Sequence, residues 1–296
     1  MIKRLTYFIS LLILPSIPLA QHSLSFDGSD DYVGIGSSSN FDVVDGLTIS
    51  AWIKSNEIKD ASIIDRLVDS GNNDTGENGY RLNIRGNGEI WATFGTACCN
   101  DVAKTSTNFY NTGEWVHITG VFKNSNYVKL YINGNLIEST ITSRTFNTNN
   151  PLEFGRGNWG ANDEDFNGLI DEVAIWNDAL SAMEVAALYN SGNPLTASTN
   201  SGYYTSSSNL VGYWQMNEGS GTYITDASGT GNSGTIYGAT WSTDTPGGTS
   251  SGGNDDGSVE LLTGSSESGV SGNEQGYPLN SYYHDVKHQS LYLASD

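Results

Sequence analysis

The chain has 296 residues, of which 37% are hydrophobic and 11% aromatic, and this composition excludes a protein that is disordered throughout. Its 33 acidic residues against 13 lysines and arginines give a formal net charge of -20, which would repel nucleic-acid phosphates and anionic membrane surfaces, so we expect neither as a partner. The 35 glycines and the charged fraction of 16% favour a turn-rich β protein over a helical one.

The first 20 residues have the pattern of a secretory signal peptide. Lys3 and Arg4 precede a mostly apolar stretch, 5–14, which is too short to remain as a membrane span. We expect cleavage near Gln21 and a secreted or cell-surface protein. No later segment approaches about 18 consecutive apolar residues, so we expect no membrane span.

Alternation of apolar and polar residues with period two predicts several strands. It is clearest in 47–54, where Leu47, Ile49, Ala51 and Ile53 alternate with Thr48, Ser50, Trp52 and Lys54. Shorter examples occur at 80–84, 90–94 and 116–122. Short strands separated by glycine and asparagine turns are typical of an antiparallel sandwich.

The two cysteines, Cys98 and Cys99, are neighbours and cannot link distant strands. Adjacent Cα atoms lie about 3.8 Å apart, below the roughly 4.4 Å usual for a disulfide, so a bond between them would be strained. Two thiols in a loop are the simpler interpretation, and a vicinal disulfide is the alternative, which an oxidising environment outside the cell would promote.

Two local motifs predict a turn and a helix. Asn133-Gly134, between apolar residues, predicts a two-residue hairpin turn, because both positions accept the positive φ angles of that turn. Ser181 and Glu184 have the spacing of a capping box and predict the start of a short helix, which Gly192 and Pro194 would end.

Six segments in order resemble a known family: Ser25–Gly28, Asp31–Val33, Leu47–Ile53, Trp115–His117, Leu130–Gly134 and Phe166–Val173. The chain from 21 to 195 is similar to the LamG-like jelly roll of the concanavalin A-like lectin/glucanase superfamily, in its bacterial secreted form. The resemblance implies an all-β fold: a two-sheet antiparallel jelly-roll sandwich with one short C-terminal helix. The same fold also carries enzymes, so function has to be argued from the site.

The remaining residues predict a small β extension and a flexible tail. Residues 196–244 resemble strands associated with such jelly rolls; they either join the sandwich or begin an incomplete second copy. We favour the first, because roughly 35 residues cannot bury a core unaided. Residues 245–257 read as a glycine- and serine-rich linker, and 258–296 as the start of a further, truncated segment of a longer modular protein.

Catalytic acids of the glucanase type are not found in the sequence. Such enzymes resemble one another in a strand with two Glu and an Asp between them, and no such run occurs here. Asp171 and Glu172 are adjacent on a predicted strand, which predicts that they face opposite sides. The four histidines form no convincing triad with serine and aspartate. We therefore favour a noncatalytic protein.

Calcium is the ion that an acidic, exported chain would best supply with oxygen ligands. The family resemblance implies that Asp27 of the first strand and Asp171 of the last strand come together to hold a structural Ca²⁺. The alternative is that Asp27 caps a turn.

Sugar binding requires flat aromatic faces in solvent with polar groups beside them. Trp159 in a predicted loop, flanked by Arg156 and Asn158, fits best, with Trp91 and Tyr80 as second choices. The alternative is that these aromatic residues fill the core.

The sequence as a whole predicts a secreted, noncatalytic carbohydrate-binding or adhesion module of a larger protein. Its partner would be a polysaccharide or an extracellular glycan or protein. A glycoside hydrolase of the same superfamily and a purely structural spacer remain alternatives.

Overall fold

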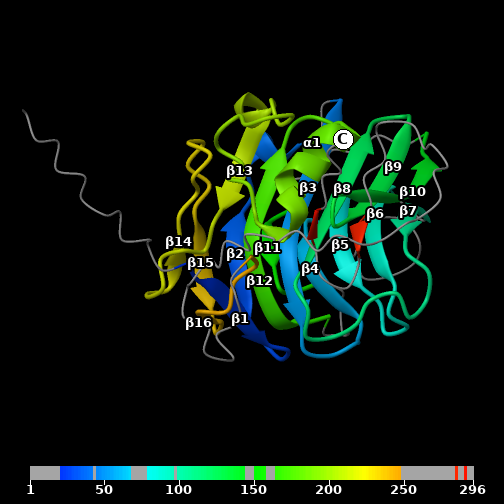
Figure 1. Cartoon of the computed structure of the whole chain (residues 1–296). Coiled ribbons are helices and arrows are strands. Elements are labelled where there is room, and N and C mark those ends of the chain that lie inside the picture. The colour runs from blue at the N-terminus through cyan, green and yellow to red at the C-terminus, as the bar shows by residue number, and fades with distance from the viewer. Residues whose placement is uncertain are drawn as a thin grey trace, which may run out of the picture. The chain divides into compact units, whose positions relative to one another are not determined.

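The computed structural model describes residues 21–42, 45–67, 79–96, 99–143, 150–157 and 164–247, together with two short strands in the C-terminal part (Figure 1). The chain divides into two units, Met1–Ser250 and Ser251–Asp296. The described residues of the second unit form one antiparallel pair, β17 (His284–Asp285) and β18 (Ser290–Leu291). The fold and the site that follow belong to the first unit.

The first unit is a sandwich of two antiparallel sheets with eight described strands each. Sheet A contains, in spatial order, β10 (Asn135–Ile141), β9 (Tyr127–Ile132), β8 (Val116–Lys123), β3 (Gly46–Ser55), β12 (Asn167–Trp176), β1 (Ser23–Asp27) and β16 (Thr240–Ser242), with β13 (Leu210–Trp214) also paired to β12. Sheet B contains β14 (Tyr223–Ile224), β15 (Gly234–Tyr237), β2 (Tyr32–Gly36), β11 (Leu152–Phe154), β4 (Ala61–Asp65), β5 (Gly79–Ile84), β6 (Ile90–Thr96) and β7 (Cys99–Lys104). This arrangement confirms the predicted jelly-roll sandwich.

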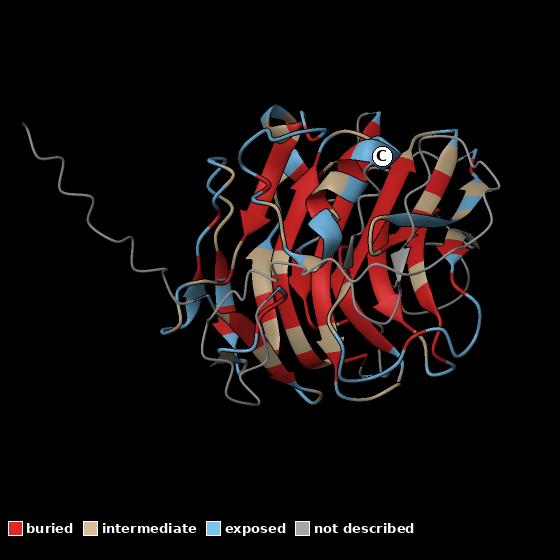
Figure 2. Cartoon of the chain, viewed as in Figure 1, coloured by how far each residue is buried: buried red, intermediate tan, exposed pale blue. Residues whose placement is uncertain are grey.

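The core lies between the two sheets, where the alternating pattern places the apolar side chains. Figure 2 shows that the strands consist largely of buried residues. In β3 every second residue, from Leu47 to Ile53, is fully buried between the sheets. The intervening residues of β3 lie on the outer face of sheet A. Thr48, Ser50 and Trp52 are buried there as well, because further structure covers that face.

The hairpin between β9 and β10 follows from its two turn residues. Ile132 pairs with Asn135, and the residues between them, Asn133 and Gly134, have φ angles of 49° and 75°. Positive φ at both central positions is the requirement of a type I′ turn. The predicted hairpin is therefore confirmed.

The helix α1 (Ala182–Tyr189) covers part of the outer face of sheet A. The hydroxyl of Ser181 accepts a hydrogen bond from the Glu184 N–H at 3.3 Å, and the Glu184 carboxylate accepts one from the Ser181 N–H at 3.0 Å. This is the predicted capping box. Val185 and Leu188 pack on the sheet in a second apolar cluster. Three short 3-10 turns complete the described helical structure: η1 (Ser39–Phe41), η2 (Asn190–Gly192) and η3 (Ser207–Asn209).

The strands that follow α1 extend both sheets. β13 and β16 pair with β12 and β1 in sheet A, and β15 pairs with β2 in sheet B, so late strands lie beside the first strands of the chain (Figure 1). Trp214 of β13 is fully buried; its ring centre lies 5.0 Å from that of Phe154 and 6.2 Å from that of Phe41. The extension thus supplies part of the core.

Candidate functional site

The outer face of sheet B carries a continuous row of residues that are paired from strand to strand. From β15 to β7 the register joins Thr235, Gly34, Glu153, Asp65, Arg81, Thr93 and Val102. We call these residues the cross-strand row. Six intervals of about 4.8 Å give it a length of roughly 29 Å. Thr235 at one end is exposed, whereas the middle members of the row, Glu153, Asp65, Arg81 and Thr93, are buried.

Two tyrosines stand beside the row at the end formed by β2 and β15. Tyr32 and Tyr237 are directly opposite in the register, and their rings stack with centres 4.4 Å apart and an angle of 11°. Gly34, the member of the row next to both tyrosines, has no side chain. A Cβ at this position would lie 3.4 Å from the Tyr237 ring and 3.6 Å from the Tyr32 ring. Tyr237 is 47% exposed, so this aromatic pair faces solvent.

Arg156 covers the Tyr32 ring and joins it to the row. Its guanidinium carbon lies 3.5 Å from the centre of the Tyr32 ring. The same guanidinium donates to both carboxylate oxygens of Glu153, at 2.7 and 3.3 Å. We call Tyr32, Tyr237 and Arg156 the aromatic end. It combines a flat apolar surface with charged hydrogen-bonding groups, which is the combination that a sugar ring requires.

The centre of the face is a buried charged network. Arg81 donates to Glu164 at 2.8 Å, and the Ser62 hydroxyl lies 3.1 Å from Asp65 and 3.3 Å from Glu164. Burial raises the pKa of Asp65 to about 6, although Arg81 opposes this shift. A carboxylic acid of raised pKa beside a second carboxylate is also the pairing that glycoside hydrolysis uses. Here Asp65 and Glu164 are only 3% and 6% exposed and are bonded to neighbouring side chains.

Trp91 lies further along the same face, on β6. Its indole N–H donates to Glu89 at 2.7 Å, and the charged groups of Arg85 and Lys104 lie 5.0 and 5.2 Å from the ring centre. Two cations therefore already contact this partly buried ring. For this reason Trp91 is a weaker stacking surface than Tyr237.

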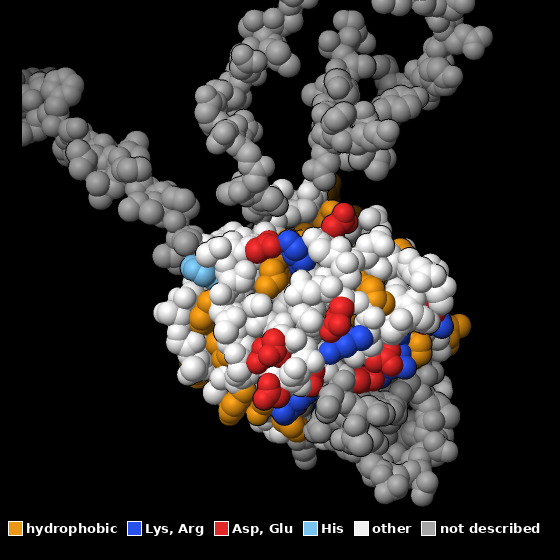
Figure 3. All heavy atoms as spheres, turned by 90° about the horizontal axis from the view of Figure 1, so that it is seen from below, with side chains coloured by type: hydrophobic (Ala, Val, Ile, Leu, Met, Phe, Trp, Pro, Cys, Tyr) orange, Lys and Arg blue, Asp and Glu red, His pale blue; other side chains and the backbone are white. Residues whose placement is uncertain are grey.

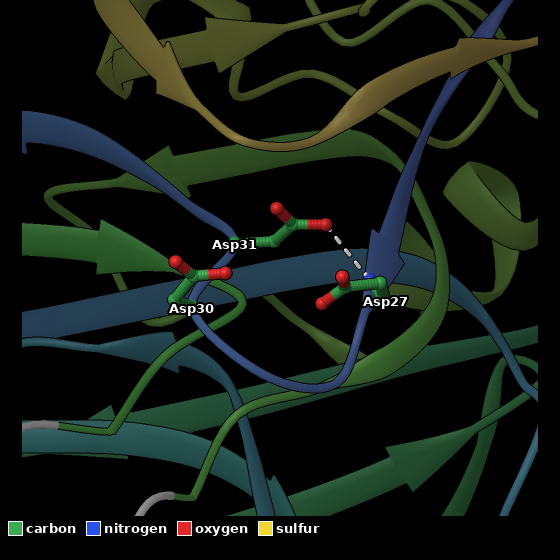
Figure 4. A group of neighbouring side chains, drawn as sticks. All are labelled: Asp27, Asp30 and Asp31. Carbon is green, nitrogen blue, oxygen red and sulfur yellow. Dashed lines mark hydrogen bonds between the residues drawn. The ribbon is translucent and has the colours of Figure 1, made fainter.

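Three carboxylates gather at the turn after β1 (Figure 4). Ligand atoms of Asp27, Asp30 and Asp31 lie within 4.8 Å of one another. Asp31 accepts a hydrogen bond from the Asp27 N–H at 2.8 Å, and Asp27 accepts one from the Ser29 N–H at 2.9 Å. Burial, and then the charges of Asp27 and Asp30, raise the pKa of Asp31. This set consists of oxygen donors only and fits Ca²⁺, whose binding would relieve the mutual repulsion.

The predicted calcium pair, Asp27 with Asp171, is not brought together. Asp27 pairs with Asn167 of β12, and Asp171 lies four residues further along that strand, a separation of about 13 Å. Asp171 instead pairs with Trp52 on the outer side of sheet A. The proposal of a structural calcium therefore moves from that pair to Asp27, Asp30 and Asp31.

A small cavity lies on the outer face of sheet A beside α1. Ser50, Trp52, His117, Glu172, Trp176 and Leu188 are among the residues that line it. His117 Nε2 lies 2.7 Å from the Ser50 hydroxyl, while Nδ1 has no partner in the described part of the chain. Burial lowers the pKa of His117 to about 3. Among the residues that the structure describes, no carboxylate is bonded to His117, so the pair lacks the third member of a catalytic triad.

A β-bulge changes the predicted orientation of Asp171 and Glu172. The pairing of β12 with β3 shifts between Asp171 and Ala174, and Glu172 has a φ of 49°. Regular alternation would place the two carboxylates on opposite faces, but the bulge leaves both on the outer side of sheet A. Burial raises the pKa of both groups, that of Glu172 to about 7, and the charge of Glu172 raises the pKa of Asp171 further.

The structure places the other ligand-binding residues predicted from the sequence in different parts of the chain. Arg156 and Trp91 lie on the outer face of sheet B as described. Tyr80 is fully buried in the core, because it occupies an inward position of β5, and it is not at a surface that a glycan can reach. Asn158, Trp159 and Cys98 lie outside the described residues. Cys99 belongs to β7, and its side chain is also outside what is described.

Tyr32 and Tyr237 were missed by the sequence reasoning. The signal for Tyr237 was present in the alternation of 234–237, where Gly234 and Ile236 are buried and Thr235 and Tyr237 are exposed. Its partnership with Tyr32 depends on the register between β15 and β2, which no local pattern reveals. Within the described residues, no helix has the length and apolar character to cross a membrane.

A family model described as the concanavalin A-like lectin/glucanases superfamily matches residues 27–186, more than half of the chain. No curated protein matches the chain significantly. Among solved structures, a protein of Bacteroides ovatus described as a candidate carbohydrate-binding protein is similar, with a TM-score of 0.57 and 18% identity. That match covers 77% of this chain and 61% of the Bacteroides protein.

Two other similar structures have lower scores. The heptameric SAP-like pentraxin of Limulus polyphemus gives a TM-score of 0.46 at 14% identity, over 59% of this chain and 84% of the pentraxin. The binding domain of the paraclostridial mosquitocidal protein 1 gives 0.46 at 20% identity, over 57% and 43% of the two chains. The family match, together with the two-sheet architecture, shows that the chain belongs to the concanavalin A-like lectin/glucanase superfamily.

Proposed function

We propose that the chain is a secreted, noncatalytic module that binds a polysaccharide or another extracellular glycan along the outer face of sheet B. One observation carries this proposal: the stacked, solvent-exposed Tyr32–Tyr237 pair at the end of the cross-strand row. The similarity to the Bacteroides protein, which shares the fold, is consistent with this role.

The aromatic end has the chemistry of a sugar contact. One face of Tyr237 rests on Tyr32, and almost half of its side chain is exposed, which leaves apolar area for the C–H surface of a pyranose. Arg156 and Glu153 stand on the other side of Tyr32 and can bond to hydroxyl groups. The exposed Thr235, which is paired with Gly34, offers one further polar contact beside the two tyrosines.

The charge of the protein agrees with a ligand that is not a polyanion. Acidic and basic side chains lie next to one another on the face seen in Figure 3. The arginines described in the strands of sheet B or just after them have carboxylate partners. Arg66 pairs with Asp42, Arg81 and Arg85 pair with Glu164, and Arg156 pairs with Glu153. With a net charge of -20, the protein offers phosphate- or sulfate-rich chains little attraction.

The proposal is tested by calorimetric titration of the full chain against a panel of polysaccharides. Tyr237→Ala should lower affinity for the bound member at least about tenfold, because it removes an aromatic contact of roughly 0.5–1.5 kcal/mol together with its buried area. Tyr203→Ala is the matched control, since Tyr203 is 74% exposed but lies in the loop before η3, away from sheet B. Trp159→Ala tests the sequence-predicted loop contact in the same assay.

Two results would contradict the proposal. Equal affinities for wild type and Tyr237→Ala would remove the aromatic end as the binding surface, and no binding to any member of the panel would favour a structural spacer. Release of reducing sugar from the same panel would instead identify a glycoside hydrolase.

A further inference from the structure

The accessible part of the outer face of sheet B extends from the aromatic end toward the edge of the sheet. From Gly34 toward the centre, the cross-strand row continues through Glu153, Asp65 and Arg81, which are buried. From Gly34 toward the edge, it reaches the exposed Thr235, and the last strand of the sheet beyond it is β14. A ligand at the aromatic end therefore finds accessible surface over β15 and β14.

The exposed face of Tyr237 is on the side of β14. Arg156, Tyr32 and Tyr237 stack in that order, so one face of Tyr237 is covered by Tyr32. β15, which carries Tyr237, lies between β2, which carries Tyr32, and β14. The other face of the Tyr237 ring is therefore directed toward β14, and it accounts for much of the exposure of this side chain.

The position opposite Tyr237 on the next strand is a glycine. The pairing of β14 with β15 continues to Thr222, whose carbonyl accepts a hydrogen bond from the Ile236 N–H at 2.9 Å. The preceding residue, Gly221, then corresponds to Tyr237 in the register. A Cβ at Gly221 would meet no atom of another segment within 4 Å. A sugar ring therefore has room beside the exposed face of Tyr237.

A third tyrosine stands next to this space. Tyr223 of β14 is directly opposite Thr235 in the register and is 54% exposed. Its neighbour Ile224 is buried in the core, so alternation places Tyr223 on the outer face, the face on which Thr235 and Tyr237 are exposed. Tyr223 and Tyr237 are thus diagonal neighbours, with Cα atoms about 7 to 8 Å apart.

We propose that Tyr223 is a second stacking contact and that the module binds an uncharged glycan chain through at least two successive sugar units. This inference rests on the proposed function and specifies the class of ligand that the same surface accepts. The chain lies over β15 and β14, with one unit on the exposed face of Tyr237 and the next unit on Tyr223. The separation of the two tyrosines favours a chain over a single sugar, because one ring stacked on Tyr237 leaves Tyr223 to its neighbour.

The residues around the two contacts favour hydroxyl groups over charges. Thr235, opposite Tyr223, is exposed, and its hydroxyl both donates and accepts, as a sugar hydroxyl does. Arg156, the cation of the aromatic end, is already paired with Glu153 at 2.7 Å. Among the residues that form this surface, no unpaired cation is therefore offered to an anionic sugar.

The test uses the polysaccharide that binds in the panel, a fragment of six of its sugar units and its constituent monosaccharide. In calorimetric titration of the full chain, the six-unit fragment should bind at least about tenfold more tightly than the monosaccharide, because it reaches both tyrosines. Tyr223→Ala should lower affinity for the six-unit fragment about three- to tenfold, because one stacking contact is lost.

Two variants separate stacking from other effects. Tyr223→Phe keeps the ring and removes only the hydroxyl, so it should bind the six-unit fragment as tightly as the wild type. Tyr203→Ala removes a tyrosine that is even more exposed but lies outside this face, and it should leave affinity unchanged. Since both positions are on the surface, all three variants should melt within about 2 °C of the wild type.

The outcomes separate this inference from the proposed function. If Tyr237→Ala loses affinity while Tyr223→Ala keeps it, the glycan site stands and the second contact is refuted. A loss in Tyr223→Phe as large as that in Tyr223→Ala would refute stacking on this ring. A monosaccharide that binds as tightly as the six-unit fragment would refute recognition of a chain, and preference for uronate-bearing polysaccharides would refute the ligand class. If the wild type binds no polysaccharide, both proposals fail.

Discussion

Protonation of His117 should make the sandwich unstable in mild acid, and the effect can be isolated with one substitution. His117 is 3% exposed, its Nε2 is bonded to Ser50, and its ring centre lies 5.1 Å from that of Trp52 and 6.2 Å from that of Tyr189. The titratable group that shares its cavity is Glu172. His117→Gln keeps a polar side chain at this position but removes the titration.

The magnitude follows from the difference between the folded and unfolded pKa values. Burial lowers the pKa of folded His117 to about 3, against about 6.5 when unfolded. Between these values the unfolded state binds more protons, so the stability that neutral His117 supports is complete above pH 6.5 and is lost as the pH falls toward 3. At pH 4.5, two pH units below the unfolded value, the loss amounts to about 2.7 kcal/mol.

Urea denaturation of wild type and His117→Gln, followed by tryptophan fluorescence at several pH values, measures this loss. Asp65 and Glu172, whose pKa values are raised, act in the opposite direction, but they do so in both proteins and largely cancel in the difference. At pH 7.5 the wild type should be more stable by about 1–3 kcal/mol, through packing and the Ser50 hydrogen bond. By pH 4.5 that advantage should have vanished. A difference that stays constant from pH 7.5 to 4.5 would refute the burial of a neutral His117.

Two further predictions concern stability. Gly155→Ala should lower the free energy of unfolding, measured in urea, by about 3 kcal/mol, because Gly155 has a φ of 81° and a Cβ would lie 2.4 Å from the buried Phe26 ring. In the control Gly36→Ala, the φ is 89° but the space around the residue is open, so the loss should be only about 1 kcal/mol. Equal losses in the two variants would contradict the steric argument. Calcium at a hundredfold excess over its Kd should stabilise the wild type by about 2.7 kcal/mol in thermal melting, and Asp30→Asn should weaken this effect. Equal melting temperatures in calcium and in chelator would refute the proposed calcium site.

The parts of the fold that could be predicted from the sequence are those in which neighbouring residues carry the physical cause. Asn133 and Gly134 tolerate the positive φ angles of their turn, and Ser181 and Glu184 satisfy each other's backbone amides, wherever these segments lie in the molecule. Alternation in β3 identified the inward and outward residues because the side-chain period of a strand is two.

The parts that could not be predicted depend on register between distant segments. Tyr32 and Tyr237 meet only because β15 pairs with β2, and Asp27 misses Asp171 because the pairing of β1 with β12 places Asn167 opposite it. The bulge at Glu172 shows the same limit, since one extra residue in β12 reverses the expected side of a carboxylate.

The place of Trp214 in the core has a consequence for how such modules are exchanged between proteins during evolution. The family match stops at residue 186, whereas this indole fills space between Phe41 and Phe154 from a strand that starts at Leu210. A recombination event that ended at the family boundary would transfer the two sheets without Trp214 and leave a cavity in their core. For the transferred module to fold, the gene segment that encodes the later strands must therefore be inherited together with the segment that encodes the earlier ones, as a single genetic cassette.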